Sequence, residues 1–142
     1  MVDRDLVTRK IALVVDDLRA VTPIAQKRLD DYLASATDEL VTERYLERMI
    51  GRMIDVNYHL VTESGEAPPR DYHESFVALS RVGALPGEFA RRLALCAGLR
   101  NRIVHAYDDL DPSRVYDSLR DALADVPAYL TAIRDFLDSH RP

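Results

Sequence analysis

The chain has few of the residues on which several protein classes depend. Glycine occurs only 5 times in 142 residues, too few for the turns that many short strands would need. Cys96 is the single cysteine, so an intramolecular disulfide and a multi-cysteine zinc site are excluded. No apolar run approaches the roughly 18 residues of a membrane span, and the charged N-terminus MVDRDLVTRK is unlike a signal peptide. We therefore expect a cytoplasmic protein with no membrane partner.

Lysine is also scarce, since only Lys10 and Lys27 stand among the 19 basic residues and the other 17 are arginines. The net charge of −5 argues against a protein that coats nucleic acid, because such binding neutralises many phosphates. A local phosphate site stays open, since the planar guanidinium of arginine suits phosphate and carboxylate. A GC-rich genome would give the same excess of arginine, so each arginine is judged by its position.

Helical periodicity runs through almost the whole chain. Apolar residues at three- and four-residue spacing predict helices over residues 3–21, 25–34, 38–62, 71–83 and 87–105. A last helix follows Asp111-Pro112, a capping residue and a first-turn proline. Its apolar seam consists of Leu119, Leu123, Val126, Leu130, Ile133 and Leu137. Pro127 lies inside this seam and is expected to kink the helix without ending it.

Three segments mark the boundaries between these helices. Thr22-Pro23 predicts the end of the first helix, with Thr22 as a cap and Pro23 in the first turn of the next. The stretch ESGEAPPR (63–70) predicts a loop, because glycine and two prolines cannot continue a helix. Asp71 and Glu74 have the spacing of a capping box at the start of a short helix.

These elements predict an all-α, up-and-down bundle of four to five main helices, in a single domain over residues 1–142. No segment has the two-residue period of a strand. The charged positions of the 38–62 helix are interpreted as a solvated face, with a partner surface as the alternative: Glu43, Arg44, Glu47, Arg48 and Arg52.

The usual catalytic motifs are missing from the sequence. The four histidines (His59, His73, His105 and His140) include no i,i+4 pair, and there is no HExxH motif. A glycine-rich phosphate loop and a GxSxG elbow are also missing. The sequence therefore disfavours metal catalysis and a serine nucleophile, and we expect no cofactor. Cys96 is interpreted as a small buried residue.

Residues 99–109 stand apart from the rest of the chain. The apolar stripe of the 87–105 helix passes through Leu93 and Cys96, and its next member is Arg100, a charge that needs a partner or a purpose. Histidine can move a proton and arginine can stabilise a pentacoordinate phosphate, so His105 beside Arg100 suits phosphodiester cleavage without metal. The alternative is that Arg100 is a paired or surface charge and His105 a satisfied histidine at a helix end.

The arrangement Arg100-Asn101-x3-His105-x-Tyr107 resembles the RNxxxHxY motif of HepT-like proteins, bacterial toxins within the HEPN group of helical ribonucleases. The similarity extends through residues 42–60 and 71–119. It implies a HEPN-like fold and a dimeric, metal-independent RNA endonuclease whose active site forms between two protomers. Arg100 and His105 would be catalytic and Asn101 supporting.

The resemblance also implies a partner and a form of control. The toxins of this type VII-like toxin–antitoxin system are neutralised by an MntA-like nucleotidyltransferase antitoxin, which transfers AMP to the motif tyrosine. Here that residue would be Tyr107. The RNA substrate is tRNA in some members of the family and mRNA in others.

Spacing raises one geometric question. Arg100 and His105 lie roughly 140° apart on an unbroken α-helix. Local distortion of the helix, the reach of the arginine, or pairing across the dimer would each bring them together. A dimer would also supply two histidines, one base and one acid. Arg102, Arg91 and Arg92 are candidate RNA contacts, although an exposed helix face explains Arg91 and Arg92 equally well.

A second hypothesis is a helical dimerisation or antitoxin-interaction module without catalytic activity. The intact Arg100, His105 and Tyr107 favour the enzyme, whereas the net acidity favours the module.

Overall fold

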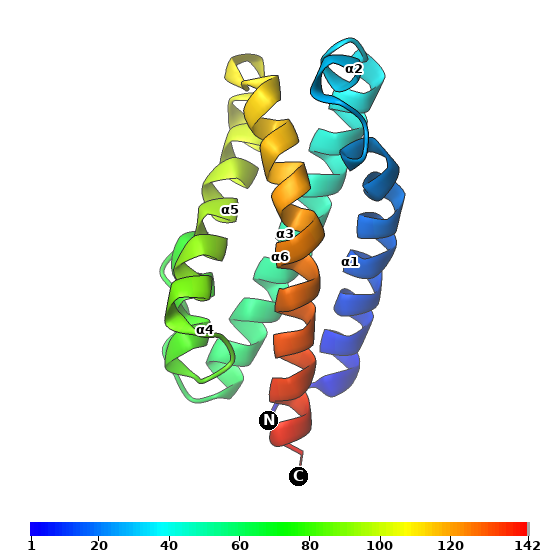
Figure 1. Ribbon diagram of the computed structural model, residues 1–142. Helices are drawn as coiled ribbons and strands as arrows, with labels where there is room; N and C mark the ends of the chain where they lie inside the picture. The colour runs from blue at the N-terminus through cyan, green and yellow to red at the C-terminus, as the bar shows by residue number, and fades with distance from the viewer. Residues whose placement is uncertain (142) are drawn as a thin grey trace.

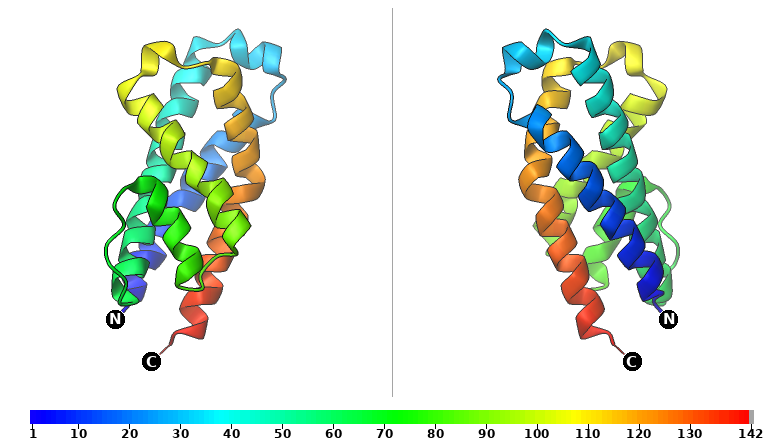
Figure 2. Two further views of the ribbon diagram at one scale, coloured as in Figure 1. Left: turned by 90° about the vertical axis from the view of Figure 1, so that its left-hand side faces the viewer. Right: turned by 90° about the vertical axis from the view of Figure 1, so that its right-hand side faces the viewer.

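The computed structural model describes residues 1–141, and these form six α-helices and one 3-10 turn (Figure 1). The elements are α1 (Arg4–Ala25), α2 (Leu29–Leu33), α3 (Ala36–Glu63), α4 (Tyr72–Arg81), α5 (Gly87–His105), η1 (Tyr107–Asp109) and α6 (Pro112–Ser139). The long helices α1, α3, α5 and α6 alternate in direction, and the short α4 lies against α5 (Figures 1 and 2). No strand occurs within residues 1–141, so the predicted all-α bundle is confirmed.

The two ends of the bundle differ. Both termini lie at one end, whereas α2 and η1 lie at the other (Figure 1). None of the helices within the described part of the chain is long and apolar enough to span a membrane.

Side-chain caps start α4 and α6 at the positions that the sequence predicts. The Asp71 carboxylate accepts a hydrogen bond from the Glu74 backbone N–H at 2.7 Å, and Asp111 accepts one from Ser113 at 3.0 Å. Each bond satisfies an N–H that the first turn of a helix leaves free. The capping box at α4 is completed one residue early, because the Glu74 carboxylate accepts from the backbone N–H of Arg70.

The predicted boundary at Thr22-Pro23 is wrong. Helix α1 continues through both residues to Ala25, and the Thr22 hydroxyl donates to the Leu18 carbonyl at 2.6 Å instead of capping a new helix. Val21 and Ala25 are both buried, so the extra turn extends the packed face of α1. Proline in this last turn removes a single backbone hydrogen bond. The next helix, predicted over 25–34, is reduced to α2.

Helix α6 also continues through its proline, Pro127, as the apolar period predicts. The kink expected at Pro127 stays a prediction.

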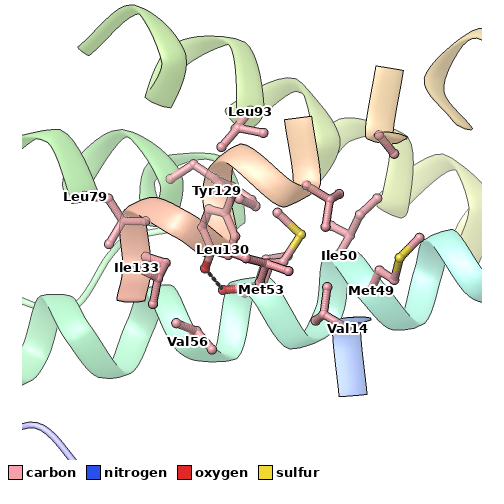
Figure 3. Packing of buried hydrophobic residues seen from close by; sticks show 14 of the residues in the cluster. Val14, Met49, Ile50, Met53, Val56, Leu79, Leu93, Tyr129, Leu130 and Ile133 are labelled. Carbon is pink, nitrogen blue, oxygen red and sulfur yellow. Dashed lines mark hydrogen bonds between the residues drawn. The ribbon is translucent and has the colours of Figure 1, made fainter. Parts of the chain in front are cut away.

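The core lies where α3, α5 and α6 meet, with α1 and α4 closing it (Figure 3). Asn57 interrupts the apolar stripe of α3 and is fully buried, but its polar atoms are satisfied. The Tyr129 hydroxyl of α6 lies 2.6 Å from Asn57 Oδ1 and 3.2 Å from the Met53 carbonyl, and Asn57 Nδ2 donates to Ser75 Oγ at 3.3 Å. This network fixes the register of α3, α4 and α6, because a one-turn slip would leave buried polar groups unpaired.

The charged face of α3 is only partly solvated, which corrects the interpretation from sequence. The exposed Arg44 forms an ion pair with the half-buried Glu47 at 3.3 Å. Arg48 and Arg52 instead reach Asp17 of α1, a buried carboxylate, at 3.3 and 2.6 Å. The period of α3 places both arginines on the polar side, and the sequence cannot show that a buried acid of another helix faces them.

Candidate active site

The residues of the RNxxxHxY motif lie at the end of the bundle that is far from the termini. Helix α5 ends at His105, and Ala106 leaves the helical conformation (φ −136°, ψ 38°) while its N–H still donates to the Arg102 carbonyl. Tyr107 then begins the 3-10 turn η1. The motif therefore spans the last turns of α5 and the bend that leads to α6.

Most motif side chains are exposed. Asn101, Arg102 and His105 are exposed, and 66% of Tyr107 is accessible although it is a large aromatic residue. Helix α5 is α-helical without interruption through His105, so local distortion does not bring Arg100 and His105 together. The reach of the arginine and pairing across a dimer remain as the two ways to do so.

Arg100 is the half-buried member of the motif, and its side chain lies against α3 and α4. Its guanidinium carbon is 5.3 Å from the centroid of the Tyr72 ring. Its Nε would be 3.4 Å from a Cβ atom at Gly51, so the bare backbone there leaves room for the arginine stem. Nε is enclosed and has no hydrogen-bond partner among residues 1–141. Within the same residues, Arg100 also has no carboxylate at ion-pair distance.

The two other candidate RNA contacts on α5 differ from each other. Arg92 is held by the Asp125 carboxylate of α6 at 2.8 Å and lies over the Phe89 ring at 5.0 Å. Arg91 is exposed. Its position leaves it free to contact a ligand, whereas Arg92 would first have to give up Asp125.

Two of the other three histidines make structural contacts, and Cys96 is half-buried. His59 Nε2 accepts from the Asp3 N–H at 2.8 Å, and the His140 ring stacks on Phe136 with centroids 4.0 Å apart. Burial raises the pKa of the Cys96 thiol to about 11, which disfavours a thiolate nucleophile. Among the residues that the structure describes, no three His, Cys, Asp or Glu side chains are grouped to hold a metal ion.

A groove of about 530 Å³ runs beside the motif, between α5 and α6 over α3. Its floor is apolar, with Met49, Leu99 and Val126 among the lining residues, and Arg102 of the motif reaches its edge. Leu95 also lines this groove and is 68% exposed. An apolar floor with a charged edge and an exposed leucine is typical of a surface that another chain covers.

Comparison with known proteins identifies the family. A family model described as ribonuclease HepT-like matches residues 11–133. The tRNA nuclease HepT of Aphanizomenon flos-aquae (strain 2012/KM1/D3) is 38% identical over 109 residues, which cover 77% of this chain and 74% of the relative. This chain belongs to the HepT-like ribonuclease family.

Solved structures of related fold agree with the bundle of this HepT-like chain. The tri-AMPylated HEPN toxin of Shewanella oneidensis, solved in complex with an MNT antitoxin, superposes with a TM-score of 0.84 at 20% identity and covers 93% of this chain and 98% of that one. YutE of Bacillus subtilis, a cytosolic protein of unknown function, gives a TM-score of 0.84 at 17% identity, over 97% and 92% of the two chains. At these identities the likeness concerns the fold.

The site of this HepT-like ribonuclease contains two residues that sequence reasoning missed. Neither Tyr72 nor Gly51 stands out in the sequence, yet the Arg100 guanidinium lies over the Tyr72 ring and the Arg100 stem lies beside Gly51. The available signal was Arg100 itself, because a charge on an apolar stripe must lie against neighbouring helices. The sequence does not show which residues of those helices it meets.

Proposed function

We propose that this chain is a metal-independent RNA endonuclease, the toxin of a type VII-like toxin–antitoxin system. The observation that carries the proposal is the arrangement of Arg100 and His105 in this family member. Arg100 holds a charge with no carboxylate partner among residues 1–141, on the helix whose exposed end carries His105. A positive group without a carboxylate suits a phosphate.

The reaction would be transfer of the phosphate to the neighbouring 2′-oxygen. One histidine removes the proton of the 2′-hydroxyl, whose oxygen attacks phosphorus. The bond to the 5′-oxygen breaks, and a second, protonated histidine gives that leaving oxygen its proton. The products are a 2′,3′-cyclic phosphate and a 5′-hydroxyl. Arg100 stabilises the extra negative charge on the pentacoordinate phosphate, and Asn101 orients the reacting groups.

The need for two histidines supports a homodimer, since each chain offers one motif histidine. The groove between α5 and α6 supports the same assembly, because a second copy seated on it would bury its apolar floor and the exposed Leu95. Sedimentation at micromolar concentration should then give twice the chain mass of 16.1 kDa. A monomer that cleaves RNA would contradict the composite site.

The relative from Aphanizomenon flos-aquae supports tRNA as the substrate, since it is named a tRNA nuclease. Messenger RNA is the second candidate. Arg102 and Arg91, both exposed on α5, would contact the RNA backbone, and Arg92 would join them on release from Asp125. Such a reaction places the protein in the cytoplasm.

Neutralisation by an MntA-like nucleotidyltransferase would act at Tyr107. The Shewanella oneidensis neighbour is an AMPylated toxin in complex with an MNT antitoxin. The exposed Tyr107 hydroxyl would attack the α-phosphorus of ATP, lose its proton and take the adenylyl group, and pyrophosphate would leave. The adduct would bring negative charge and bulk to the end of α5, where RNA must bind.

Intact-mass spectrometry tests this switch directly. Co-expression with the nucleotidyltransferase should add one or more adenylyl groups to the chain, and Tyr107→Phe should prevent the addition at this position. An unchanged gain in the Tyr107→Phe chain would place the modification elsewhere.

The activity itself is tested by RNA cleavage in EDTA. His105→Ala should reduce the rate by about 10²–10⁴-fold, the usual contribution of a proton-transfer group. His140→Ala is the matched control and should leave cleavage unchanged, because this histidine is the C-cap of α6 and that end of α6 lies at the opposite end of the bundle from η1 (Figure 1). A strict requirement for added magnesium would contradict the mechanism.

The alternative, a non-catalytic interaction module, is favoured by the net charge of −5, which repels RNA at long range. The module would form the dimer and bind the antitoxin, yet wild type and His105→Ala would be equally inactive on RNA.

A further inference from the structure

Arg100 is half-buried, and the groups that hold it are unusual for an arginine in that setting. Its stem crosses α3 at Gly51, and its guanidinium lies over the ring of Tyr72, the first residue of α4. The ring provides a flat, weakly negative face that attracts a cation. A carboxylate in the same place would hold the arginine more firmly but would also neutralise it.

Two of the three other arginines that lie over aromatic rings also bind a carboxylate. Arg48 lies over Tyr45 at 5.6 Å and also binds Asp17, and Arg92 lies over Phe89 and also binds Asp125. In both pairs the ring adds to an ion pair. The third, Arg120, lies over Tyr116 at 5.8 Å without an ion pair among the described residues, but it donates to the Tyr116 hydroxyl at 3.3 Å. Arg100 has neither a carboxylate nor an acceptor for its Nε among the described residues, which makes Tyr72 the main group that fixes the guanidinium.

The acidic residues nearest to Tyr72 in the chain are bound elsewhere. Asp71 caps α4 by accepting from the Glu74 N–H. Glu74 accepts from both the backbone N–H and the side chain of Arg70, and a second oxygen lies 3.5 Å from Arg81. The hydrogen bonds from Arg70 and the charges of Arg70 and Arg81 hold the pKa of Glu74 below its ordinary value. The start of α4 therefore presents a ring to Arg100 while its carboxylates bind other groups.

Tyr72 is itself fixed in place. Its ring meets the edge of Tyr58 on α3, with centroids 6.3 Å apart and planes at 82°. It is 41% exposed, so one side of the Tyr72–Arg100 pair remains open to solvent. A T-shaped pair of this kind restrains the ring on which the guanidinium rests.

We infer that Tyr72 is a positioning residue for Arg100, which holds the guanidinium by its ring face and leaves the positive charge free for an RNA phosphate. This inference rests on the proposed ribonuclease function for its consequence in catalysis. Its structural part, that the Tyr72 ring fixes the guanidinium, rests only on the contacts of Arg100. The two parts are therefore tested separately.

Catalysis is tested with three variants in the full-length chain. Tyr72→Leu should lower kcat by about 2- to 30-fold, the range that a cation–π contact spans between exposed and desolvated sites, and should leave KM and the pH profile unchanged. Tyr72→Phe should restore kcat, because it keeps the ring. Tyr45→Leu is the matched control, since it removes the ring under an arginine that keeps its carboxylate, and it should leave kcat unchanged. A Tyr72→Leu chain with wild-type kcat, or a Tyr72→Phe chain as slow as Tyr72→Leu, would overturn the inference.

The structural part is tested by ¹⁵N relaxation of the Arg100 Nε–H group, assigned by its loss in Arg100→Lys. We expect this N–H to be rigid in the wild type and in Tyr72→Phe and mobile in Tyr72→Leu. Equal rigidity in Tyr72→Leu would overturn the inference. Because this readout needs no RNA, a chain that proves inactive on RNA would refute the proposed function while the relaxation result still decides the role of Tyr72.

Discussion

Arg48 and Arg52 on the one hand and Arg100 on the other have opposite kinds of partner in this bundle. Arg48 and Arg52 of α3 both bind Asp17, a carboxylate that is only 4% exposed, and so join α3 to α1. Arg100 of α5 is also half-buried, yet it lies against a ring and a glycine and has no carboxylate within the described part of the chain. The first group is neutralised, whereas the second keeps its charge.

The difference indicates which charges stabilise the fold and which serve a ligand. A buried carboxylate between two arginines is satisfied, and removing one partner leaves it short of a hydrogen bond. A buried guanidinium N–H without an acceptor is unfavourable to folding. Arg100 Nε is in that position, which is understandable where the arginine is retained for a phosphate.

The largest expected effect is on cleavage and separates the two groups. Arg100→Ala should lower kcat by about 10²–10³-fold, as the loss of one group that stabilises transition-state charge does. Arg52→Ala should leave kcat near wild type at a temperature where both chains are folded. An RNA cleavage assay with circular dichroism as the folding check measures both, and comparable losses would erase the contrast.

The next largest effect is on stability, and here Arg52 matters more than Arg100. Arg52→Ala should lower the free energy of unfolding by about 1–3 kcal/mol, because Asp17 loses its shorter ion pair and stays buried. Because Arg48 still pairs with Asp17 in this variant, the loss should be smaller than for a buried carboxylate with no partner. Urea denaturation measures the change, and an unaltered midpoint would show that Asp17 does not need Arg52.

Removing the charge of Arg100 should stabilise the fold. Arg100→Met keeps an unbranched stem beside Gly51 and eliminates the unpaired Nε, so the free energy of unfolding should rise by about 1 kcal/mol. The same variant should be inactive on RNA. A lower denaturation midpoint would mean that the ring of Tyr72 more than offsets the missing hydrogen bond.

Gly51→Ala should have a smaller effect. A glycine in the middle of a helix is about 0.5–1 kcal/mol less stable than alanine, so α3 should gain that amount. The new Cβ would make an ordinary contact with Arg100 Nε at 3.4 Å, and cleavage should change little. Thermal unfolding and the RNA assay check the two statements. A strong loss of cleavage would show that Arg100 needs more room than this contact leaves.

The smallest effect concerns acid. The pKa of Glu74 is lowered from 4.5, first by the Arg70 backbone N–H and then by the Arg70 side chain. Its contribution to stability is therefore present above the ordinary pKa and is lost as the pH falls through the lowered one. Urea unfolding below about pH 5 should depend less on pH in Glu74→Gln than in the wild type. Identical pH profiles of the two chains would mean that the Glu74 carboxylate does not stabilise the start of α4.

Much of the fold could be predicted from local patterns. The long apolar periods place α3, α5 and α6, and Asp71 and Asp111 mark helix starts, because these signals act within one turn of the chain. The predicted boundary at Thr22-Pro23 was wrong for a non-local reason, because the buried side chains of Val21 and Ala25 keep α1 helical past a proline. The satisfied Asn57 likewise depends on Tyr129, which lies 72 residues away.

The site could be predicted only as a list of residues. Arg100 is conspicuous in the sequence because it interrupts an apolar stripe, and the motif resemblance adds His105 and Tyr107. The partners that give Arg100 its state, Tyr72 and Gly51, come from other helices and carry no local signal. The interpretation of Arg48 and Arg52 as solvated residues was wrong for the same reason, since nothing near them in the chain indicates that they bind Asp17.

The most direct test of the central claim, a composite site that needs His105 from two chains, is a mixing experiment. Wild-type and His105→Ala chains are co-expressed in equal amounts, and RNA cleavage is measured at fixed total protein. If both histidines of a dimer are required, random pairing leaves about one quarter of the wild-type activity. Activity of about one half would mean that each chain cleaves RNA alone, and it would contradict the account.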